Sequence, residues 1–238
     1  MSDFSDRVVV ITGATGNLGT AVARKFMVSG AKMGFLERSP DKINILFPEI
    51  VNAPDQYQVQ QVDVTNPDSM KEVAIELLRK FGHIDILVNT VGGYRAGSPL
   101  HQTPLDTLDF MLNLNSRSVF VSCQAFIPSM IENNYGKIVN ISARPGLSGV
   151  RNAAAYSASK SAVIRLTESM SSELKHKGIN VNCVIPGTLD TPQNRQTMPD
   201  ADFNRWVSPN SIADVILFLA SDVASAIHGA TIPVYGSS

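Results

Sequence analysis

Apolar positions along the chain follow two different patterns. A continuous apolar run at 8–11 is typical of a strand buried on both faces of a parallel sheet, because neither face carries a polar side chain, and a second buried strand is predicted at 84–88. Further strands are predicted at 32–36, 58–62, 137–141, 180–185 and 231–234. Helical spacing of apolar residues predicts helices at 17–29, 67–81, 105–133 with a break near 113–116, 153–176 and 212–219. The alternation predicts an α/β fold, with one domain over residues 1–238 and a single doubly wound parallel sheet of about seven strands with helices on both faces.

A glycine-rich turn joins the first predicted strand to the first predicted helix. Glycines let a backbone approach a pyrophosphate, and the N-terminus of the following helix supplies unpaired N–H groups and a partial positive charge. A strand before the turn and a helix after it are the context that this motif requires. We therefore predict a Rossmann-type dinucleotide site, the alternative being a tight turn with a structural role alone. The predicted cofactor contacts in the turn are Gly13, Thr15, Gly16, Asn17, Leu18 and Gly19.

The second predicted strand ends at Glu37 and Arg38. An acidic residue about 20 positions after the glycines accepts hydrogen bonds from the adenosine ribose in dinucleotide folds. Glu37 would repel a 2′-phosphate, whereas Arg38 could pair with one. Because the carboxylate occupies the space that the phosphate needs, we expect NAD(H) to be favoured over NADP(H). The alternative is that both residues are solvated loop charges.

Tyr156 and Lys160 lie four positions apart in the predicted helix 153–176, so their side chains project from the same face. A free tyrosine has a pKa of about 10 and transfers protons poorly at neutral pH. An ammonium one turn away favours the phenolate, so we expect it to lower the pKa of Tyr156. The pair is predicted to transfer a proton, unless the two residues are merely surface neighbours.

Composition narrows the class of protein. Hydrophobic residues make up 44% and charged residues 17%, and the net charge of −1 offers no attraction for nucleic acid or an anionic membrane. Cys123 and Cys183 have no metal or redox spacing, and we expect buried free thiols in a reducing compartment. Polar residues lead directly into the strand at residue 8, so neither a signal peptide nor a membrane span is predicted. We expect a cytoplasmic protein with a small-molecule substrate and with no metal, nucleic-acid or membrane partner.

Taken in order, these motifs resemble the short-chain dehydrogenase/reductase family over essentially the whole chain. Thr12–Gly19 is similar to the family's cofactor loop, and Tyr156-x-x-x-Lys160 to its catalytic pair. The resemblance implies that Asn115 kinks a helix and helps to hold a proton-relay water. It also implies further cofactor contacts at Asp63, Val64, Asn89, Val91, Gly92, Tyr156, Lys160, Pro186, Gly187 and Thr188.

Two departures from the family concern the turn and the catalytic serine. Asn17 stands where the common branch has glycine, and we expect the turn to survive because asparagine tolerates a left-handed backbone. The family's serine falls at Ala143, whereas Ser142 is one position early and is expected to face away from the substrate. In the alternative interpretation, the loop is shifted by one residue and Ser142 is the catalytic serine. The candidate catalytic set is therefore Tyr156, Lys160, Asn115 and Ser142.

Residues 186–206 resemble dihydropteridine reductase more specifically. That enzyme also lacks the usual serine, has Gly-Gly at the position of Gly92-Gly93, and uses NADH. The resemblance implies a short substrate lid at about 188–207, although reductases with other substrates can share such a lid. The matching pieces are Thr188-Leu189-Asp190-Thr191-Pro192, Asn194-Arg195, Met198-Pro199, Ala201-Asp202-Phe203 and Trp206.

The predicted activity is hydride transfer from NAD(P)H to a C=O or C=N group, with Tyr156 donating the proton and Lys160 holding the nicotinamide ribose. Two alternatives stay open: a carbonyl or 3-oxoacyl reductase of the same family, and a non-catalytic NAD(H)-binding sensor. Family resemblance and apolar residues on the two long helices also predict a homodimer or homotetramer. These apolar residues are Phe120, Phe126, Ile127, Ile164 and Leu166.

Overall fold

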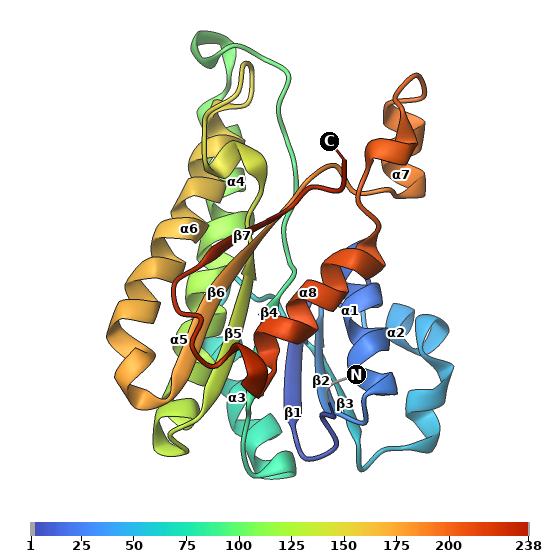
Figure 1. Ribbon diagram of the computed structural model, residues 1–238, viewed down its shortest axis with the longest axis vertical. Coiled ribbons are helices and arrows are strands. Elements are labelled where there is room, and N and C mark those ends of the chain that lie inside the picture. The colour runs from blue at the N-terminus through green and yellow to red at the C-terminus, as the bar shows by residue number, and fades with distance from the viewer. Residues whose placement is uncertain (1–2, 238) are drawn as a thin grey trace.

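The computed structural model describes residues 3–237, which form a parallel seven-stranded sheet in the order β3-β2-β1-β4-β5-β6-β7 (Figure 1). The chain builds outwards from β1 to β3 and then crosses back, so that β4 pairs with β1 on its other side. This reversal opens a crevice beyond the carboxyl ends of β1 and β4, the place where ligands bind in such sheets. The strands are β1 Val8–Thr12, β2 Lys32–Glu37, β3 Tyr57–Gln61, β4 Ile86–Asn89, β5 Gly136–Ile141, β6 Ile179–Pro186 and β7 Thr231–Val234.

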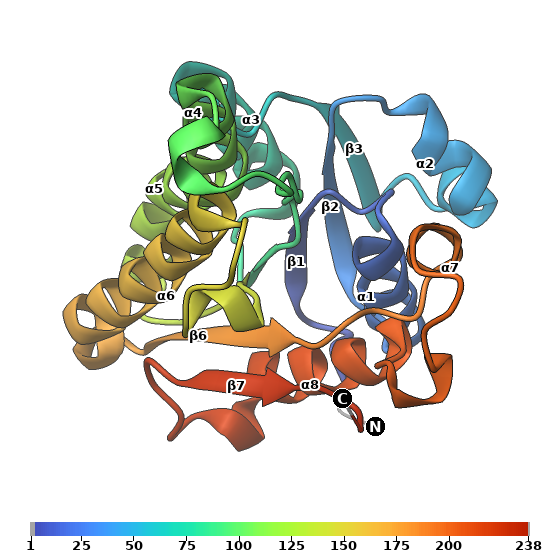
Figure 2. The same ribbon diagram turned by 90° about the horizontal axis from the view of Figure 1, so that it is seen from above.

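Helices provide most of the connections between strands and cover both faces of the sheet (Figure 2). They are α1 Asn17–Val28, α2 Asp41–Leu46, α3 Pro67–Phe81, α4 Leu105–Met111, α5 Ser118–Glu132, α6 Ala154–Leu174, α7 Pro192–Thr197 and α8 Pro209–Ala220. Within residues 3–237, no helix combines the length and the apolar character needed to cross a membrane.

Alternating side chains of the strands separate the core into two layers. On β1, Val9 and Ile11 pack into the cluster under α1 and α8, whereas Val8 and Val10 pack into the cluster under α3, α5 and α6. Polar side chains are absent from this strand apart from its last residue, Thr12, because both faces are covered. The sheet is therefore a rigid support for the residues that follow its carboxyl ends.

The predicted fold class is confirmed, and the predicted strands and long helices agree with the structure to within a few residues at their ends. The predicted break near 113–116 is a π-helical segment, Leu112–Arg117, between α4 and α5. The helices α2 and α7 were not predicted, because six residues are too few for helical spacing to be recognised. Cys123 and Cys183 are buried free thiols, as expected.

Candidate active site

The glycine turn after β1 is packed too tightly for side chains. Gly13 has a left-handed backbone (φ +73°), and a Cβ there would lie 2.9 Å from Val91 Cγ2. A Cβ on Gly19 would collide with the Gly13 carbonyl, so α1 sits directly on the turn. Asn17 is the first helical residue rather than a left-handed one, so the expected tolerance of asparagine is not what preserves the turn. No side chain caps α1, which leaves the N-terminus of this helix open to a phosphate.

Glu37 is fixed beside this turn. One carboxylate oxygen accepts a hydrogen bond from the Thr15 N–H at 2.6 Å, and the residue is only 7% exposed. Arg38 is exposed and pairs with Asp63 at 3.7 Å. The Thr65 backbone and hydroxyl, followed by Arg38, hold the pKa of Asp63 below its ordinary value.

A cavity of about 210 Å³ opens beside Glu37 and Arg38. Its walls are mostly apolar and its volume suits a flat heteroaromatic base, while the uncapped α1 suits a pyrophosphate. These residues therefore fit a dinucleotide. The residues that line the cavity are Leu36, Glu37, Arg38, Val62, Val64, Val91 and Leu114.

The ammonium of Lys160 lies at the carboxyl end of β5. The residue is 5% exposed, and its Nζ donates a hydrogen bond to the Ile141 carbonyl at 3.0 Å. A Cβ on Gly92 would lie only 3.1 Å from this Nζ, so the glycine gives the ammonium its space. Burial lowers the pKa of Lys160 to about 8.

Tyr156 lies one turn earlier on α6 and is half-buried. Burial, and then the neighbouring Tyr94, raise the pKa of Tyr156 to about 12. The expectation that Lys160 lowers this pKa is therefore wrong for the folded chain, because desolvation of the phenolate by burial, followed by Tyr94, raises it. Tyr156 is a neutral phenol at physiological pH and can act as an acid.

Asn115 lies in the π-helical segment and is fully buried. Its Oδ1 accepts a hydrogen bond from the Gly93 N–H at 2.9 Å, and its Nδ2 donates to the Gly93 carbonyl at 3.1 Å. The same Nδ2 donates to Ser159 Oγ at 2.9 Å, and Ser159 in turn donates to the Tyr156 carbonyl. The amide of Asn115 thus joins the loop after β4 to the turn of α6 that carries Tyr156.

Ser142 points towards α6 rather than into the crevice. Its hydroxyl is buried and donates a hydrogen bond to the Lys160 carbonyl at 2.7 Å. Ala143 follows in extended conformation (φ −159°, ψ 162°), so its methyl group points the opposite way. This geometry argues against Ser142 as the working serine and places a methyl group where the family usually has a hydroxyl.

Asn89 is buried behind the crevice. Its Nδ2 donates to Asn140 Oδ1 at 2.9 Å, and the Asn140 Nδ2 donates to Thr167 Oγ1 at 2.9 Å. This chain of amides connects β4, β5 and α6. Asn89 therefore stabilises the packing of these elements, whereas Val91 lines the cavity beside Glu37 and Gly92 lies against the Lys160 ammonium.

The segment after β6, for which a substrate lid is predicted, is stabilised by contacts among its own residues. Gly187 N–H donates to the Val234 carbonyl at 2.9 Å, and Val207 N–H donates to the Thr188 carbonyl at 3.0 Å, so the base of the lid is closed. Arg195 binds the Asp190 carboxylate through two hydrogen bonds of 2.6 and 2.8 Å. The Arg195 guanidinium also stacks on Phe203, whose ring contacts Trp206. The side chains of this segment thus hold one another.

The structure brings the glycine turn, Glu37, Gly92, Tyr156 and Lys160 to the carboxyl ends of the strands. Two further residues lie there that the sequence patterns did not indicate: Ser159, which ties Asn115 to α6, and Tyr94, whose ring lies 4.8 Å from that of Tyr156. The position of Tyr94 directly after Gly92-Gly93 at a strand end was the available signal.

A sequence model described as short chain dehydrogenase matches residues 7–202, and the chain belongs to this family of oxidoreductases. The 3-oxoacyl-(acyl-carrier-protein) reductase FabG of Thermotoga maritima is 33% identical over 97% of this chain and 96% of its own length. The dehydrogenase/reductase SDR family member 6 of Danio rerio is 32% identical over 99% of this chain and 98% of its own length.

Solved structures agree with this assignment. The NAD⁺-bound xylitol dehydrogenase superposes with a TM-score of 0.90 and 27% identity, covering 99% of this chain and 100% of that one. The ElxO protein with NADP bound superposes with a TM-score of 0.89 and 27% identity, covering 97% of both chains. These neighbours share the whole architecture, and their cofactors include both nicotinamide dinucleotides.

Proposed function

We propose that the protein reduces a C=O or C=N group of a small molecule, with NAD(P)H as hydride donor and Tyr156 as proton donor. The observation that carries the proposal is the half-buried Tyr156 phenol, one helical turn from the Lys160 ammonium, which is buried against Gly92 next to Val91, a residue that lines the cavity beside Glu37. When bound, the reduced nicotinamide would supply the hydride. Membership of an oxidoreductase family favours this activity over a non-catalytic sensor.

The pKa directions suit reduction. Because burial raises the pKa of Tyr156 to about 12, the side chain carries its proton at neutral pH and can give it to a developing alkoxide or amide anion. Lys160, with a pKa lowered to about 8, is mostly charged at pH 7 and can stabilise the phenolate that remains after transfer. Its three N–H donors also suit a ribose hydroxyl.

NAD(H) is the proposed cofactor. Its support is the buried Glu37, whose carboxylate is held by Thr15 N–H at 2.6 Å beside the cavity that fits adenine. A 2′-phosphate there would face an anion that cannot swing away. Arg38, the group that could favour NADP(H), is drawn towards Asp63.

An activated substrate of the quinonoid dihydropterin type is supported by Ala143 and by the lid. Without a serine hydroxyl aimed into the crevice, a plain ketone lacks one donor to its oxygen, a loss of typically about 10²–10³ in rate. A substrate already activated for reduction tolerates this better. The second candidate is a carbonyl or 3-oxoacyl reductase, which the similarity to the Thermotoga maritima enzyme favours.

An assay of NADH and NADPH oxidation tests the proposal, with quinonoid dihydropterin, simple ketones, quinones and 3-oxoacyl thioesters as substrates. Tyr156→Phe is expected to lose about 10²–10⁴-fold in kcat, because only the transferable proton is removed. The dissociation constant of the cofactor should stay unchanged. Normal turnover by this variant, or no oxidation of either cofactor by the native protein, would contradict the proposal.

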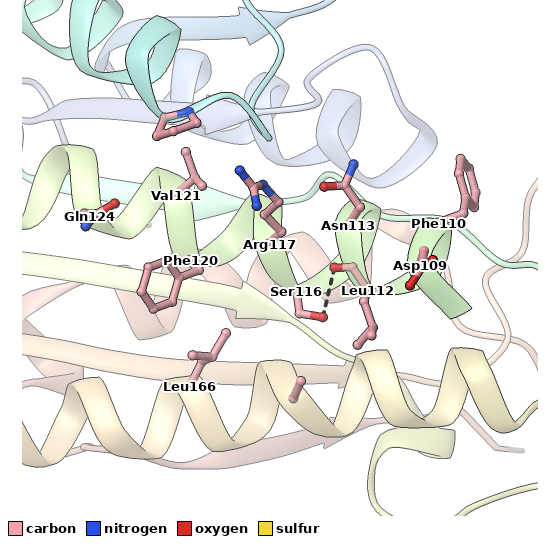
Figure 3. A pocket seen from close by; sticks show the side chains of 12 residues that line it. Asp109, Phe110, Leu112, Asn113, Ser116, Arg117, Phe120, Val121, Gln124 and Leu166 are labelled. Atoms are coloured by element: carbon pink, nitrogen blue, oxygen red, sulfur yellow. Dashed lines mark hydrogen bonds between the residues drawn. The ribbon is translucent and has the colours of Figure 1, made fainter. Parts of the chain in front are cut away.

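A homodimer or homotetramer is proposed, joined through the outer groove between α5 and α6 (Figure 3). The groove has a volume of about 870 Å³, and Phe120 and Leu166 face it from opposite helices. Phe120 is 53% exposed, whereas Phe126 and Ile164 belong to the core, so the expectation of a surface role for those two is wrong. A large exposed aromatic side chain in an apolar groove supports association.

A cytoplasmic location is proposed from the two thiols. Cys123 and Cys183 are both buried and free, and burial raises the pKa of each to about 12, which keeps them protonated and inert. Free, unreactive thiols suit a reducing compartment.

A further inference from the structure

The ring of Tyr94 rests against the ring of Tyr156. Their centroids are 4.8 Å apart and their planes meet at 82°, an edge-to-face pair. Tyr94 is 70% exposed, so most of its surface is open beside the group that carries the proton. Neither hydroxyl has a hydrogen-bond partner among residues 3–237. Tyr94 therefore shields Tyr156 on one side and leaves its hydroxyl available.

The backbone holds Tyr94 from both sides. Before it, Gly93 is bound through both its N–H and its carbonyl by Asn115, at 2.9 and 3.1 Å. After it, the Gly97 N–H donates to the Asn152 carbonyl at 2.8 Å, which ties this loop to the start of α6. These anchors leave only three residues between them, so the fold sets the backbone position of Tyr94, and the ring pair with Tyr156 orients its side chain.

Three positions in this part of the molecule have no polar side chain to offer a substrate. Gly92 and Gly93 carry no side chains, and Ala143 presents a methyl group where a serine hydroxyl would otherwise orient the substrate. Shape and ring contacts therefore gain importance for the orientation of a substrate. Aromatic pairs are favoured over equal areas of aliphatic contact when their faces and edges can align.

We propose that Tyr94 determines substrate specificity: its ring forms one wall of the substrate site beside Tyr156 and favours substrates with a flat conjugated ring next to the reacting C=O or C=N group. This inference rests on the proposed function and narrows its substrate class. The contact needs the aromatic ring and not the Tyr94 hydroxyl, because the hydroxyl is uncommitted.

Isatin and camphorquinone test the inference, because both are bicyclic dicarbonyl compounds but only isatin is flat. We expect the native enzyme to have the higher kcat/KM for isatin. Tyr94→Leu should lower the ratio of kcat/KM values, isatin over camphorquinone, by roughly tenfold, mainly through the KM of isatin. Tyr94→Phe should keep the native ratio. Phe218→Leu, the loss of an exposed aromatic ring on α8, is the control and should also keep it.

An unchanged ratio in Tyr94→Leu, or a native preference for camphorquinone, would overturn the inference. Equilibrium dialysis with 2-naphthol, a flat compound that this enzyme cannot reduce, gives a second readout without turnover. Tyr94→Leu should weaken its binding roughly tenfold relative to the native protein and to Tyr94→Phe. If the native protein oxidised neither cofactor with any substrate, the proposed function would fail, whereas equal 2-naphthol binding by all three proteins would refute the role of Tyr94.

Discussion

Asn115 binds both backbone groups of Gly93, accepting from the N–H at 2.9 Å and donating to the carbonyl at 3.1 Å. A neighbouring strand would pair with a peptide in a similar way, but here a single buried side chain on a π-helical segment does so. The amide also reaches Ser159, so one residue holds the loop beside the reaction site and the helix that carries Tyr156. The helix break predicted from sequence therefore has a structural purpose, since it turns this amide inwards.

Replacing Asn115 should damage both stability and catalysis. Asn115→Ala leaves the half-buried Gly93 N–H and carbonyl without these partners, at a cost of about 1–2 kcal/mol in unfolding free energy. Asn115→Asp keeps an acceptor for the Gly93 N–H but buries a carboxylate that faces the Gly93 carbonyl, so this variant should be no more stable than Asn115→Ala. Denaturant unfolding measures the order, and kcat should fall at least tenfold in Asn115→Ala because the loop next to Tyr156 is released. Native kcat in Asn115→Ala would show that the clamp does not serve catalysis.

Removing the charge of Glu37 should move the cofactor preference towards NADPH. Glu37→Gln keeps an acceptor for the Thr15 N–H and so preserves the turn, while the repulsion of a 2′-phosphate disappears. We expect the ratio of dissociation constants, NADPH over NADH, to fall by roughly tenfold or more, measured by fluorescence titration. Arg38→Ala serves as the opposite control and should not improve NADPH binding. Tighter NADPH binding by the native protein would mean that Arg38 controls the site.

Stability should depend on pH through Lys160. Burial lowers the pKa of Lys160 to about 8, whereas a lysine in the unfolded chain has a pKa of about 10.4. Below pH 8 the full penalty of burying the ammonium is present, and between about 8 and 10.4 it fades, because the folded chain has released the proton that the unfolded chain still binds. Lys160→Met removes this penalty but also the hydrogen bond to Ile141.

We therefore expect Lys160→Met to be more stable than the native protein at pH 7 by roughly 2 kcal/mol, and less stable by about 1 kcal/mol above about pH 10, where only the loss of the hydrogen bond to Ile141 remains. Urea unfolding at a series of pH values measures it. The variant should have almost no activity. Lys160 would then contribute to catalysis while it lowers the free energy of unfolding at neutral pH. A variant less stable than the native protein at pH 7 would contradict the buried-charge penalty.

Separate substitutions at Ser142 and Ala143 distinguish a role in stability from a role in catalysis. Ser142→Ala loses the buried hydrogen bond to the Lys160 carbonyl and should destabilise the fold by about 1 kcal/mol, while kcat falls less than tenfold. Ala143→Ser should add a donor beside Tyr156 and raise kcat/KM for plain ketones. If Ser142→Ala instead lost about 10²–10³ in kcat, the typical effect of deleting a preorganised donor, Ser142 would be the working serine.

A charge in the groove between α5 and α6 should break the oligomer. Phe120→Glu places a carboxylate that cannot be buried cheaply at the centre of the groove. Sedimentation at micromolar concentration should show the native protein as a dimer or tetramer and the variant as a monomer of 25.7 kDa. Ile45→Glu, at an exposed apolar position on α2, is the matched control and should leave the assembly intact. A monomeric native protein would remove the proposal of a homo-oligomer.

Local patterns were enough to predict the fold class correctly and to propose the main candidate site residues. A run such as Val8-Val9-Val10-Ile11 suits only a strand buried on both faces, and the glycines after it suit only a turn with a close backbone approach. Spacing along a helix likewise placed Tyr156 beside Lys160, since a four-residue separation fixes a common face. The short helix α7 was not predicted, because its six residues show no apolar helical spacing and are stabilised by contacts within the segment after β6, such as that of Asp190 with Arg195.

Tertiary structure alone decided how these residues behave. The pKa of Tyr156 rises because burial removes water from the phenolate, and sequence spacing to Lys160 contains no information on burial. Packing of β5 against α6 directed Ser142 to a backbone carbonyl, and the loop anchored by Asn115 brought Tyr94 onto Tyr156 from 62 residues away in the chain. Solvent exposure and contacts between distant segments arise only when the sheet and its helices have assembled. The protonation state of Tyr156, the direction of the Ser142 side chain and the contact of Tyr94 with Tyr156 are therefore determined by the tertiary structure.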